Sequence, residues 1–218
     1  MRSRFVEGYR RHLDWHRQHD DPLAWYGWFV SSGERVGLFI DGSFGAPYAA
    51  FDHRVNPTGD RANAAQNVAP FVDPAFRSTY VLRPTLSTGR LLEEHEPSPS
   101  IQVVYYTLRP GMQHRFEEAL AELRAVLDRA EDPPVYTWYQ LIVGGEHPAF
   151  MLMIPRYGWA DYATGAAIRA IVRRAFEPEE AAALLKMMLG AVEDVRSEVW
   201  SYREDLSYFP NREASQAN

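Results

Sequence analysis

The chain has 218 residues, of which 46% are hydrophobic and 24% are charged, and its formal net charge is −6. This composition is typical of a soluble globular protein with one large or two small domains. The acidic balance argues against a surface that holds nucleic acid through excess lysine and arginine. The lack of cysteine excludes disulfides, thiolate nucleophiles and cysteine-based metal sites.

The first predicted element is a helix that begins near Ser3 and contains the segment YRRHLDWHRQHDDP, residues 9–22. Three of the seven histidines, His12, His16 and His19, lie in this segment, and two aspartates follow them directly. Residues three and four positions apart share a helix face. His12 and His16 are therefore expected on one side of the helix, one turn apart, with His19 at the edge of that side.

Two strands are predicted next, WYGWFV (residues 25–30) and VGLFIDG (residues 36–42), and the small-residue turn between them indicates a hairpin. Alternation along the first strand separates two faces, one with Trp25, Gly27 and Phe29 and the other with Tyr26, Trp28 and Val30. Gly27 has no side chain in mid-strand, so another group can approach the backbone there.

The segment FDHRVNPTGDR, residues 51–61, interrupts helix propensity with Asn-Pro and Gly-Asp and has no counterpart in the second half of the chain. We interpret it as an insertion that carries Asp52, His53 and Arg54 and forms either a pocket rim or an ordinary loop. The segment RSTYVLRPTLS, residues 77–87, follows and resembles the end of the second half.

The second half predicts a complete supersecondary unit. Its predicted elements are a strand (100–111), a helix (112–132), two strands of a hairpin (135–143 and 148–155), two helices (158–176 and 177–195) and a strand (196–204). This β-α-β-β-α-β order is the split βαβ or ferredoxin-like unit. Its helices cover one face of an antiparallel sheet, and the other face is free to pack against a second sheet.

The two halves of the chain resemble each other in sequence. DDPLAWYGWFVSSGE, from Asp20, resembles EDPPVYTWYQLIVGGE, from Glu131, at an offset of about 111 residues, and RSTYVLRPTLS resembles RSEVWSYREDLS, from Arg196. Matches that recur in order at nearly constant spacing indicate internal repetition. We therefore predict a first repeat over residues 1–90, a linker over 91–99 and a second repeat over 100–210.

The same offset compares the two amphipathic helices. The apolar stripe of the second helix, Phe116, Leu120, Leu123 and Leu127, aligns with Phe5, Tyr9, His12 and His16. Two imidazoles thus replace two leucines on a face that should be buried. We expect both rings to point at the sheet, with Asp20 one turn further on and with a hydrogen-bond partner or ligand for each ring.

The first repeat departs from the second at its beginning. No strand precedes its helix, whereas about eleven residues of predicted strand precede the helix of the second repeat. The first strand of this topology is central in the sheet, so its loss would leave backbone groups unpaired. We hypothesise that the sequence extends upstream of Met1, or that another segment fills the position.

The segments VVYYTLRPGMQHRFEEALAEL (103–123) and WYQLIVGGEHPAFMLMIP (138–155) resemble the dimeric α+β-barrel superfamily. That group includes antibiotic-biosynthesis-type monooxygenases, stress-responsive A/B-barrel proteins, NIPSNAP-type proteins and tandem chlorite dismutase-like haem proteins. The resemblance implies an α+β fold in which two tandem ferredoxin-like repeats pack sheet to sheet as an intrachain barrel. It also implies a pocket between helices and sheet, as in the monooxygenase-type relatives, but no motif selects one activity.

Three interpretations of the histidines remain open. They are structural side chains hydrogen-bonded between helix and sheet, an acid–base or ligand site, or a zinc or iron site whose third ligand is Asp52 or His53. Our predicted site has His12 and His16 as catalytic residues and no metal. The predicted ligand-binding residues are Tyr9, Trp25, Tyr26, Trp28, Asp52, His53 and Arg54.

The sequence thus predicts an enzyme that needs no cofactor and acts on a small apolar or aromatic molecule with histidine acid–base help. The alternative is a non-catalytic binding or interaction module. A haem-binding version is a third hypothesis, for which the second half offers His114 and His147. The expected partner is a small molecule, with no nucleic acid and no membrane, and the chain is expected to be a monomer or weak homodimer. The N-terminal residues lack the apolar run of a signal peptide, so the default compartment is the cytoplasm, with an upstream targeting segment left open.

Overall fold

The computed structural model describes residues 1–73, 76–94 and 96–210, and of residues 164–167 it describes only the backbone. The fold is mixed α+β with antiparallel strand pairs. The chain divides into two compact units. The first comprises Met1–Val30, Val36–Phe76 and Ser201–Asn218, and the second comprises Ser31–Arg35 and Arg77–Trp200.

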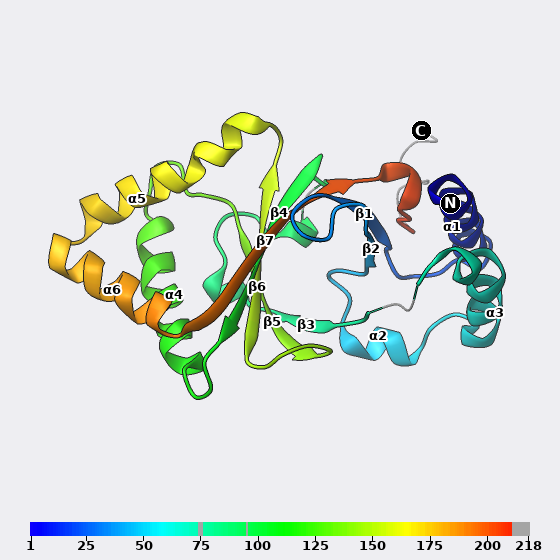
Figure 1. Ribbon diagram of the computed structural model, residues 1–218, viewed down its shortest axis with the longest axis horizontal. Helices are drawn as coiled ribbons and strands as arrows, with labels where there is room; N and C mark the ends of the chain where they lie inside the picture. Colours follow the sequence, from blue (N-terminus) through cyan, green and yellow to red (C-terminus); the bar gives the residue numbers. More distant parts are fainter. Residues whose placement is uncertain (74–75, 95, 211–218) are drawn as a thin grey trace. The chain divides into compact units, whose positions relative to one another are not determined.

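The second unit has the predicted β-α-β-β-α-β order, and its helices lie together on one face of the sheet (Figure 1). Its main elements are β4 (Ser100–Leu108), α4 (Gln113–Leu127), β5 (Thr137–Val143), β6 (Ala149–Arg156), α5 (Thr164–Ala175), α6 (Pro178–Gly190) and β7 (Val192–Tyr202). The strand order is β7-β4-β6-β5, with β3 (Thr79–Leu82) paired at the edge beside β5. Short 3-10 helices are η2 (Pro84–Leu86), η3 (Leu92–Glu94) and η4 (Trp159–Ala163).

The predicted stripe of α4 forms the core of the second unit. Phe116, Leu120 and Leu127 are buried and belong to one apolar cluster with Trp138 and Phe150. The Phe116 ring lies 5.8 Å from the Trp138 ring and 5.3 Å from the Phe150 ring, between centroids. Each such side chain contributes about 1.5–3 kcal/mol on full burial, so this layer of α4 against the sheet is a main source of stability.

The first unit places the predicted helix and hairpin beside an additional helix. Its elements are α1 (Arg2–Gln18), β1 (Tyr26–Ser32), β2 (Phe39–Gly42), α2 (Tyr48–Asp52), α3 (Pro57–Asn67), η1 (Ala69–Phe71) and η5 (Glu204–Leu206). The hairpin is confirmed, because β1 pairs antiparallel with β2 from Tyr26 opposite Gly42 to Phe29 opposite Phe39. Within this unit, α1 is the first element that the described residues form.

Our interpretation of residues 51–61 as a rim or loop that interrupts helix is wrong for its secondary structure, because most of this segment is helical. Pro57 occupies the first turn of α3, where its fixed φ suits a helix and its missing N–H costs nothing. Asn56 is the N-cap and accepts a hydrogen bond from the Gly59 amide at 3.0 Å. Asn-Pro therefore begins a helix here instead of interrupting one.

Helices α1 and α3 lie side by side because Gly8 lets them approach closely (Figure 1). A Cβ atom at Gly8 would lie only 1.9 Å from the carbonyl oxygen of Asn67 at the end of α3. Phe5 and Leu13 of α1 are buried with Phe29 of β1 in a second apolar cluster. Helix α1 thus packs against both helix α3 and strand β1 within the first unit.

The space predicted at Gly27 is filled by the backbone of η5. A Cβ atom there would lie 2.1 Å from the Leu206 carbonyl oxygen. The Gly27 amide donates to Ser207 Oγ at 3.0 Å, and the Gly27 carbonyl accepts from the Arg203 amide at 2.9 Å. Gly27 therefore serves close backbone packing within the first unit.

Two boundaries differ from expectation or stay untested. Strand β7 begins at Val192, whereas the sequence predicted a helix as far as Val195, because α6 already ends at Gly190. The repeat limits at residues 90 and 100 stay a prediction, and His95 in the predicted linker lies outside the described residues. Among the residues that the structure describes, no helix has both the length and the apolarity needed to cross a membrane.

Candidate functional site

The two histidines of α1 face the interior of the first unit, as predicted. His16 is 3% exposed, and the side chain of His12 is 13% exposed. Polar residues elsewhere on α1 are exposed, namely Arg10, Arg11, Asp14 and Gln18. The helical spacing of Phe5, Tyr9, His12 and His16 therefore predicted the buried side of α1 correctly, but not the residues that contact the imidazoles.

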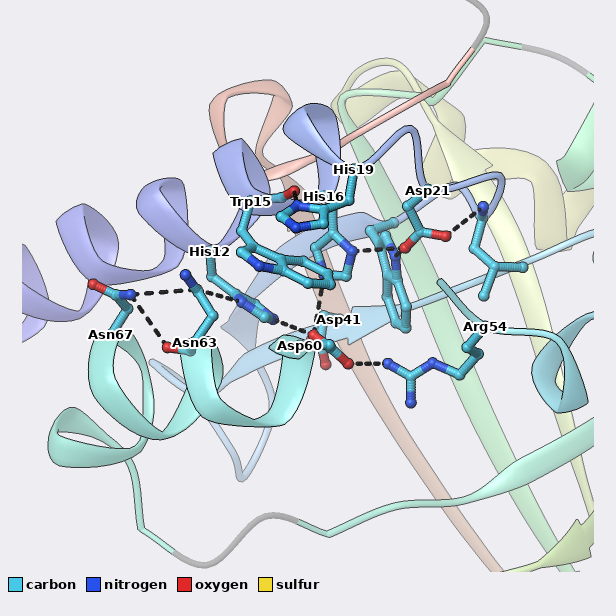
Figure 2. Close-up of polar contacts among 12 residues, drawn as sticks. His12, Trp15, His16, His19, Asp21, Asp41, Arg54, Asp60, Asn63 and Asn67 are labelled. Carbon is cyan, nitrogen blue, oxygen red and sulfur yellow. Dashed lines mark hydrogen bonds and ion pairs between the residues drawn. The ribbon is translucent and has the colours of Figure 1, made fainter. Parts of the chain in front are cut away.

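The rings face helix α3, which corrects the expectation that they point only at the sheet (Figure 2). His12 Nε2 lies 3.4 Å and His16 Nε2 lies 3.7 Å from the same atom, Oδ1 of Asp60. The two imidazole centroids are 4.7 Å apart. Asp60 lies in the first turn of α3 and is buried, so the three side chains form one polar cluster between two helices.

Asp21 holds His16, whereas Asp20 was the acidic residue expected one turn beyond the two rings. His16 Nδ1 lies 2.6 Å from Asp21 Oδ2. Asp20 has a left-handed φ of 50°, and the Asp21 amide donates back to the His16 carbonyl at 3.1 Å. This is the Schellman turn that ends many helices, and it brings the chain back so that Asp21 reaches the ring.

The hydrogen bonds of Asp21 define the proton positions on His16. Asp21 also accepts from the Leu23 amide and from Trp25 Nε1, each at 3.0 Å. Burial raises the pKa of this carboxyl, but the hydrogen bond from His16 and then those from Leu23 and Trp25 outweigh it, so the Asp21 pKa lies below its ordinary value. An ionised carboxylate only accepts, so His16 Nδ1 donates and a neutral ring keeps its lone pair on Nε2.

A chain of hydrogen bonds defines the proton position on His12. Arg11 Nε donates to Asn67 Oδ1 at 2.8 Å, which turns the Asn67 amide nitrogen toward Asn63 Oδ1 at 3.3 Å. Asn63 Oδ1 lies 2.9 Å from His12 Nδ1. Because a guanidinium only donates, the order of donors is fixed along the chain and His12 Nδ1 donates to Asn63.

The charge of His12 follows from its surroundings. Burial, the largest cause, lowers the pKa of His12 below its ordinary value, and the hydrogen bond to Asn63 opposes this. The neighbouring His16 lowers the pKa further, whereas Asp60 raises it. The net direction favours the neutral ring, with its lone pair on Nε2 directed to the same point as that of His16.

Arg54 orients the third member of the cluster. Its guanidinium forms an ion pair with Oδ2 of Asp60, which leaves Oδ1 toward the imidazoles (Figure 2). Arg54 was predicted as a ligand-binding residue on a pocket rim, and its side chain is 29% exposed. The structure places it in direct contact with the cluster.

The other predicted ligand-binding residues divide into three groups. Tyr9 and Trp25 lie near the histidines, since the Tyr9 ring is 6.3 Å from the His12 ring and the Trp25 ring is 5.4 Å from the His16 ring. The Tyr9 hydroxyl donates to Asp41 at 3.0 Å. Burial, and then Asp41, raise the pKa of Tyr9. The structure does not bring the remaining predicted residues into the cluster. Tyr26 and Trp28 stack on each other on the other face of β1, and Asp52 and His53 are exposed.

Sequence reasoning missed Asp21, Asp60 and Asn63 as members of the site. Asp60 and Asn63 are three residues apart on α3, so they share one face once that helix is recognised. The signal was present in Asn56 and Pro57, which together begin a helix. The signal for Asp21 was weaker, because only the turn after α1 selects it over Asp20.

The two cavities described in the structure lie away from the histidines. One of about 230 Å³ is lined by Gln102, Tyr136, Ile154 and Arg156, among others. The other, of about 360 Å³, lies between α4 and α6 and includes Glu122, Phe176 and Leu184. Both belong to the second unit, and neither is lined by a residue of α1.

Comparison with known proteins connects the chain to others through its fold. No protein-family model and no curated protein matches the sequence. Among solved structures, a "putative monooxygenase" from Lactobacillus acidophilus NCFM superposes with a TM-score of 0.55 and 7% identity, over 96% of this chain and 90% of that one. An anthrone oxidase-like protein matches with a TM-score of 0.47 and 12% identity, over 94% of this chain and 89% of that one. The first match shows a similar fold, and at this identity it does not establish an activity.

Proposed function

We propose that the protein is an enzyme of the oxidase or oxygenase type and that the cluster of His12, His16 and Asp60 is its reaction centre. Its substrate is a small, mostly apolar or aromatic molecule with an acidic C–H or O–H bond. The observation that carries the proposal is the convergence of two imidazole Nε2 atoms on one carboxylate oxygen in a nearly buried site. The fold shared with the Lactobacillus acidophilus protein supports the reaction class.

His16 is the residue best placed to move a proton. Asp21 orients its ring through Nδ1, as the third group of a catalytic triad orients its base. His16 Nε2 would take the proton of the substrate, giving a substrate anion and an imidazolium ion whose charge Asp21 stabilises. A positioned base of this kind contributes about 10²–10⁴-fold to a rate.

A non-catalytic binding or interaction module is the second candidate, and one observation favours it. The face of β1 that packs against α1 is filled by aromatic side chains, since Phe29 is buried in one apolar cluster with Phe5 and Tyr9. In that case the same hydrogen bonds serve only to satisfy buried polar groups between α1, α3 and the turn at Asp21.

The tandem barrel remains part of the proposal. We infer that the halves are repeats of one ferredoxin-like unit, related to the dimeric α+β barrels. Equivalent contacts support this, because Ser87 Oγ accepts from the Trp138 amide in the second unit as Ser207 Oγ accepts from the Gly27 amide in the first. A chain with both repeats needs no second copy to complete its fold, so we expect a monomer or weak dimer.

Turnover of wild type and two matched variants tests the proposed function. Dioxygen uptake and product formation are measured with a panel of small phenols, quinols and cyclic β-diketones. We expect His16→Gln to lower kcat by about 10²–10⁴-fold and to retain a cooperative unfolding transition. His114→Gln, in which the changed side chain is 83% exposed on α4, should leave turnover unchanged. Wild-type rates in His16→Gln, or loss of stability alone, would support the non-catalytic candidate.

A further inference from the structure

We propose that His12, His16 and Asp60 bind one divalent first-row transition-metal ion in a three-ligand site with open coordination positions. This inference rests on the proposed function for the place and class of the reaction, since it names the occupant of the same reaction centre. It replaces the role of His16 as the base, because an Nε2 atom that binds an ion has no lone pair left to take a proton. It revises the expectation from sequence that the site needs no metal. The ligand atoms are Nε2 of both histidines and Oδ1 of Asp60.

The distances between these atoms suit a shared ion. The three atoms lie within 4.8 Å of one another, and the two nitrogen–oxygen distances are 3.4 and 3.7 Å. An N–H···O hydrogen bond spans about 2.7–3.2 Å, so both separations are long for direct bonds. Two ligands at about 2.0–2.1 Å from one tetrahedral zinc ion lie about 3.3–3.4 Å apart. The two nitrogen–oxygen separations are therefore close to those between ligands of one ion.

The groups behind each ligand are those that metal sites use. A metal-bound histidine usually donates its other N–H to a carboxylate or carbonyl oxygen, which fixes the ring and its tautomer. Asp21 receives the Nδ1 proton of His16, and Asn63 receives that of His12. Arg54 holds Oδ2 of Asp60 and presents Oδ1 as a single oxygen donor. Each of the three ligands is thus oriented before an ion arrives.

Charge and access are compatible with a cation. Arg54 opposes it, but the carboxylates of Asp60 and Asp21 offset that charge, and Arg54 contacts the oxygen that faces away from the imidazoles. The side chains of His12 and Asp60 are 13% and 12% exposed, against 4% for His16. An ion would therefore enter between His12 and Asp60, and the same opening would admit water or a small ligand to the open positions.

The donor set indicates the class of metal. Two imidazoles and one carboxylate with open positions are typical of non-haem iron(II) sites and of catalytic zinc sites. Magnesium and calcium prefer oxygen ligands alone. We therefore expect Fe(II), Co(II) and Zn(II) to bind and Mg(II) and Ca(II) not to compete. Iron(II) in such a site is typical of oxygenases, whereas zinc has no redox chemistry, so the metal found in the active protein sharpens both proposals.

The test is metal binding by purified, metal-free protein, without any substrate. Isothermal titration with Zn(II), and anaerobic titration with Fe(II), should give one ion per chain and a raised Tm, because an ion that binds only the folded state stabilises it. Asp60→Asn keeps the size of the side chain and should weaken binding at least 100-fold, as should His16→Ala. Asp14→Asn and His19→Ala on the same helix should bind as wild type does.

Two further measurements keep the outcome clear where a variant does not fold. Nitrogen NMR of 15N-histidine protein should show Zn(II)-dependent shifts at the Nε2 atoms of His12 and His16, with Nδ1 still protonated. Binding of none of these ions by wild type, or equal binding by Asp60→Asn, would overturn the proposal and leave a hydrogen-bonded pair in which one imidazole is protonated. Loss of turnover in His16→Gln without metal binding would retain the proposed function alone, and metal binding without turnover would retain the site alone.

Discussion

The layer formed by α1, β1 and η5 in the first unit can be compared with the layer of α4, β5 and η2 in the second. In each, a 3-10 turn follows a strand and attaches to another strand through one arginine amide and one serine hydroxyl. The Arg203 amide donates to the Gly27 carbonyl at 2.9 Å, and the Arg83 amide donates to the Trp138 carbonyl at 2.8 Å. The backbone frame of the two layers is therefore the same in these contacts.

The side chains inside the two frames differ at two related positions. Leu127 is fully buried among apolar groups, whereas His16, 111 residues earlier, is buried in hydrogen-bonding distance of a carboxylate. Asp132 is exposed, whereas the corresponding Asp21 is buried and bonded to His16. The backbone frame shared by the two units therefore does not require a polar interior. The cluster in the first unit is an addition to it, with α3 supplying the third polar residue.

The largest expected effect comes from exchanging the interiors. Leu127→His would bury an imidazole without a partner and lose an apolar contact, so the free energy of unfolding should fall by about 2–5 kcal/mol. His16→Leu removes one partner of Asp21 but keeps the two other donors, and should cost about 1–3 kcal/mol. Urea unfolding of both variants measures this. A smaller loss in Leu127→His than in His16→Leu would mean that the two interiors are less different than the structure indicates.

A smaller and equal effect is expected where the frames agree. Ser87→Ala and Ser207→Ala each leave a buried strand amide without its acceptor, at Trp138 and Gly27 respectively. Each should lower the free energy of unfolding by about 1–3 kcal/mol. The hydrogen-exchange rate of the Trp138 amide should rise only in Ser87→Ala, and that of the Gly27 amide only in Ser207→Ala. Clearly unequal losses would weaken the inference that the two turns are equivalent.

The smallest expected effect is on the pH dependence of stability, and it comes from the charge of Asp205, which has no counterpart in η2. Asp205 of η5, where the corresponding residue is Thr85, has its pKa lowered to about 2 by the hydrogen bond from Arg203, against burial, with Arg10 adding to the effect. A pKa depressed in the folded state gives stability that is present above the unfolded pKa of about 4. That stability is lost as pH falls from about 4 to 2.

Asp205→Thr is the variant that makes the two turns alike. Its unfolding midpoint should lie slightly below that of wild type at pH 6, and the difference should shrink as pH falls toward 2 and vanish below it. The effect is small because the Asp205 side chain is 38% exposed and solvent screens its charge. A difference that grows as the pH is lowered would contradict the assignment of the pKa to Asp205.

Much of the second unit and the inward face of α1 could be predicted from sequence, and the site could be predicted only in part. Periodicity is enough to place Phe116, Leu120 and His16 on buried faces, because one face of a helix repeats in the sequence. Asp60 could not be found this way, since its contact with His12 depends on how two helices pack. Asp21 depends on the left-handed turn at Asp20, which aspartate adopts less often than glycine.

Gly8 allows the close approach of helices α1 and α3. With no side chain at this position, α1 and α3 meet backbone to backbone at one end, and Asn67 marks the point of contact. His12 and His16 lie about 6 Å and 12 Å further along the α1 axis. A methyl group at position 8 would push the two backbones apart at this contact. The distance between the imidazoles of α1 and Asp60 of α3 would then change as well. The spacing between the histidines and Asp60 thus depends on a residue that has no side chain to contact them, and variation at position 8 offers a way to tune the site without altering its chemistry.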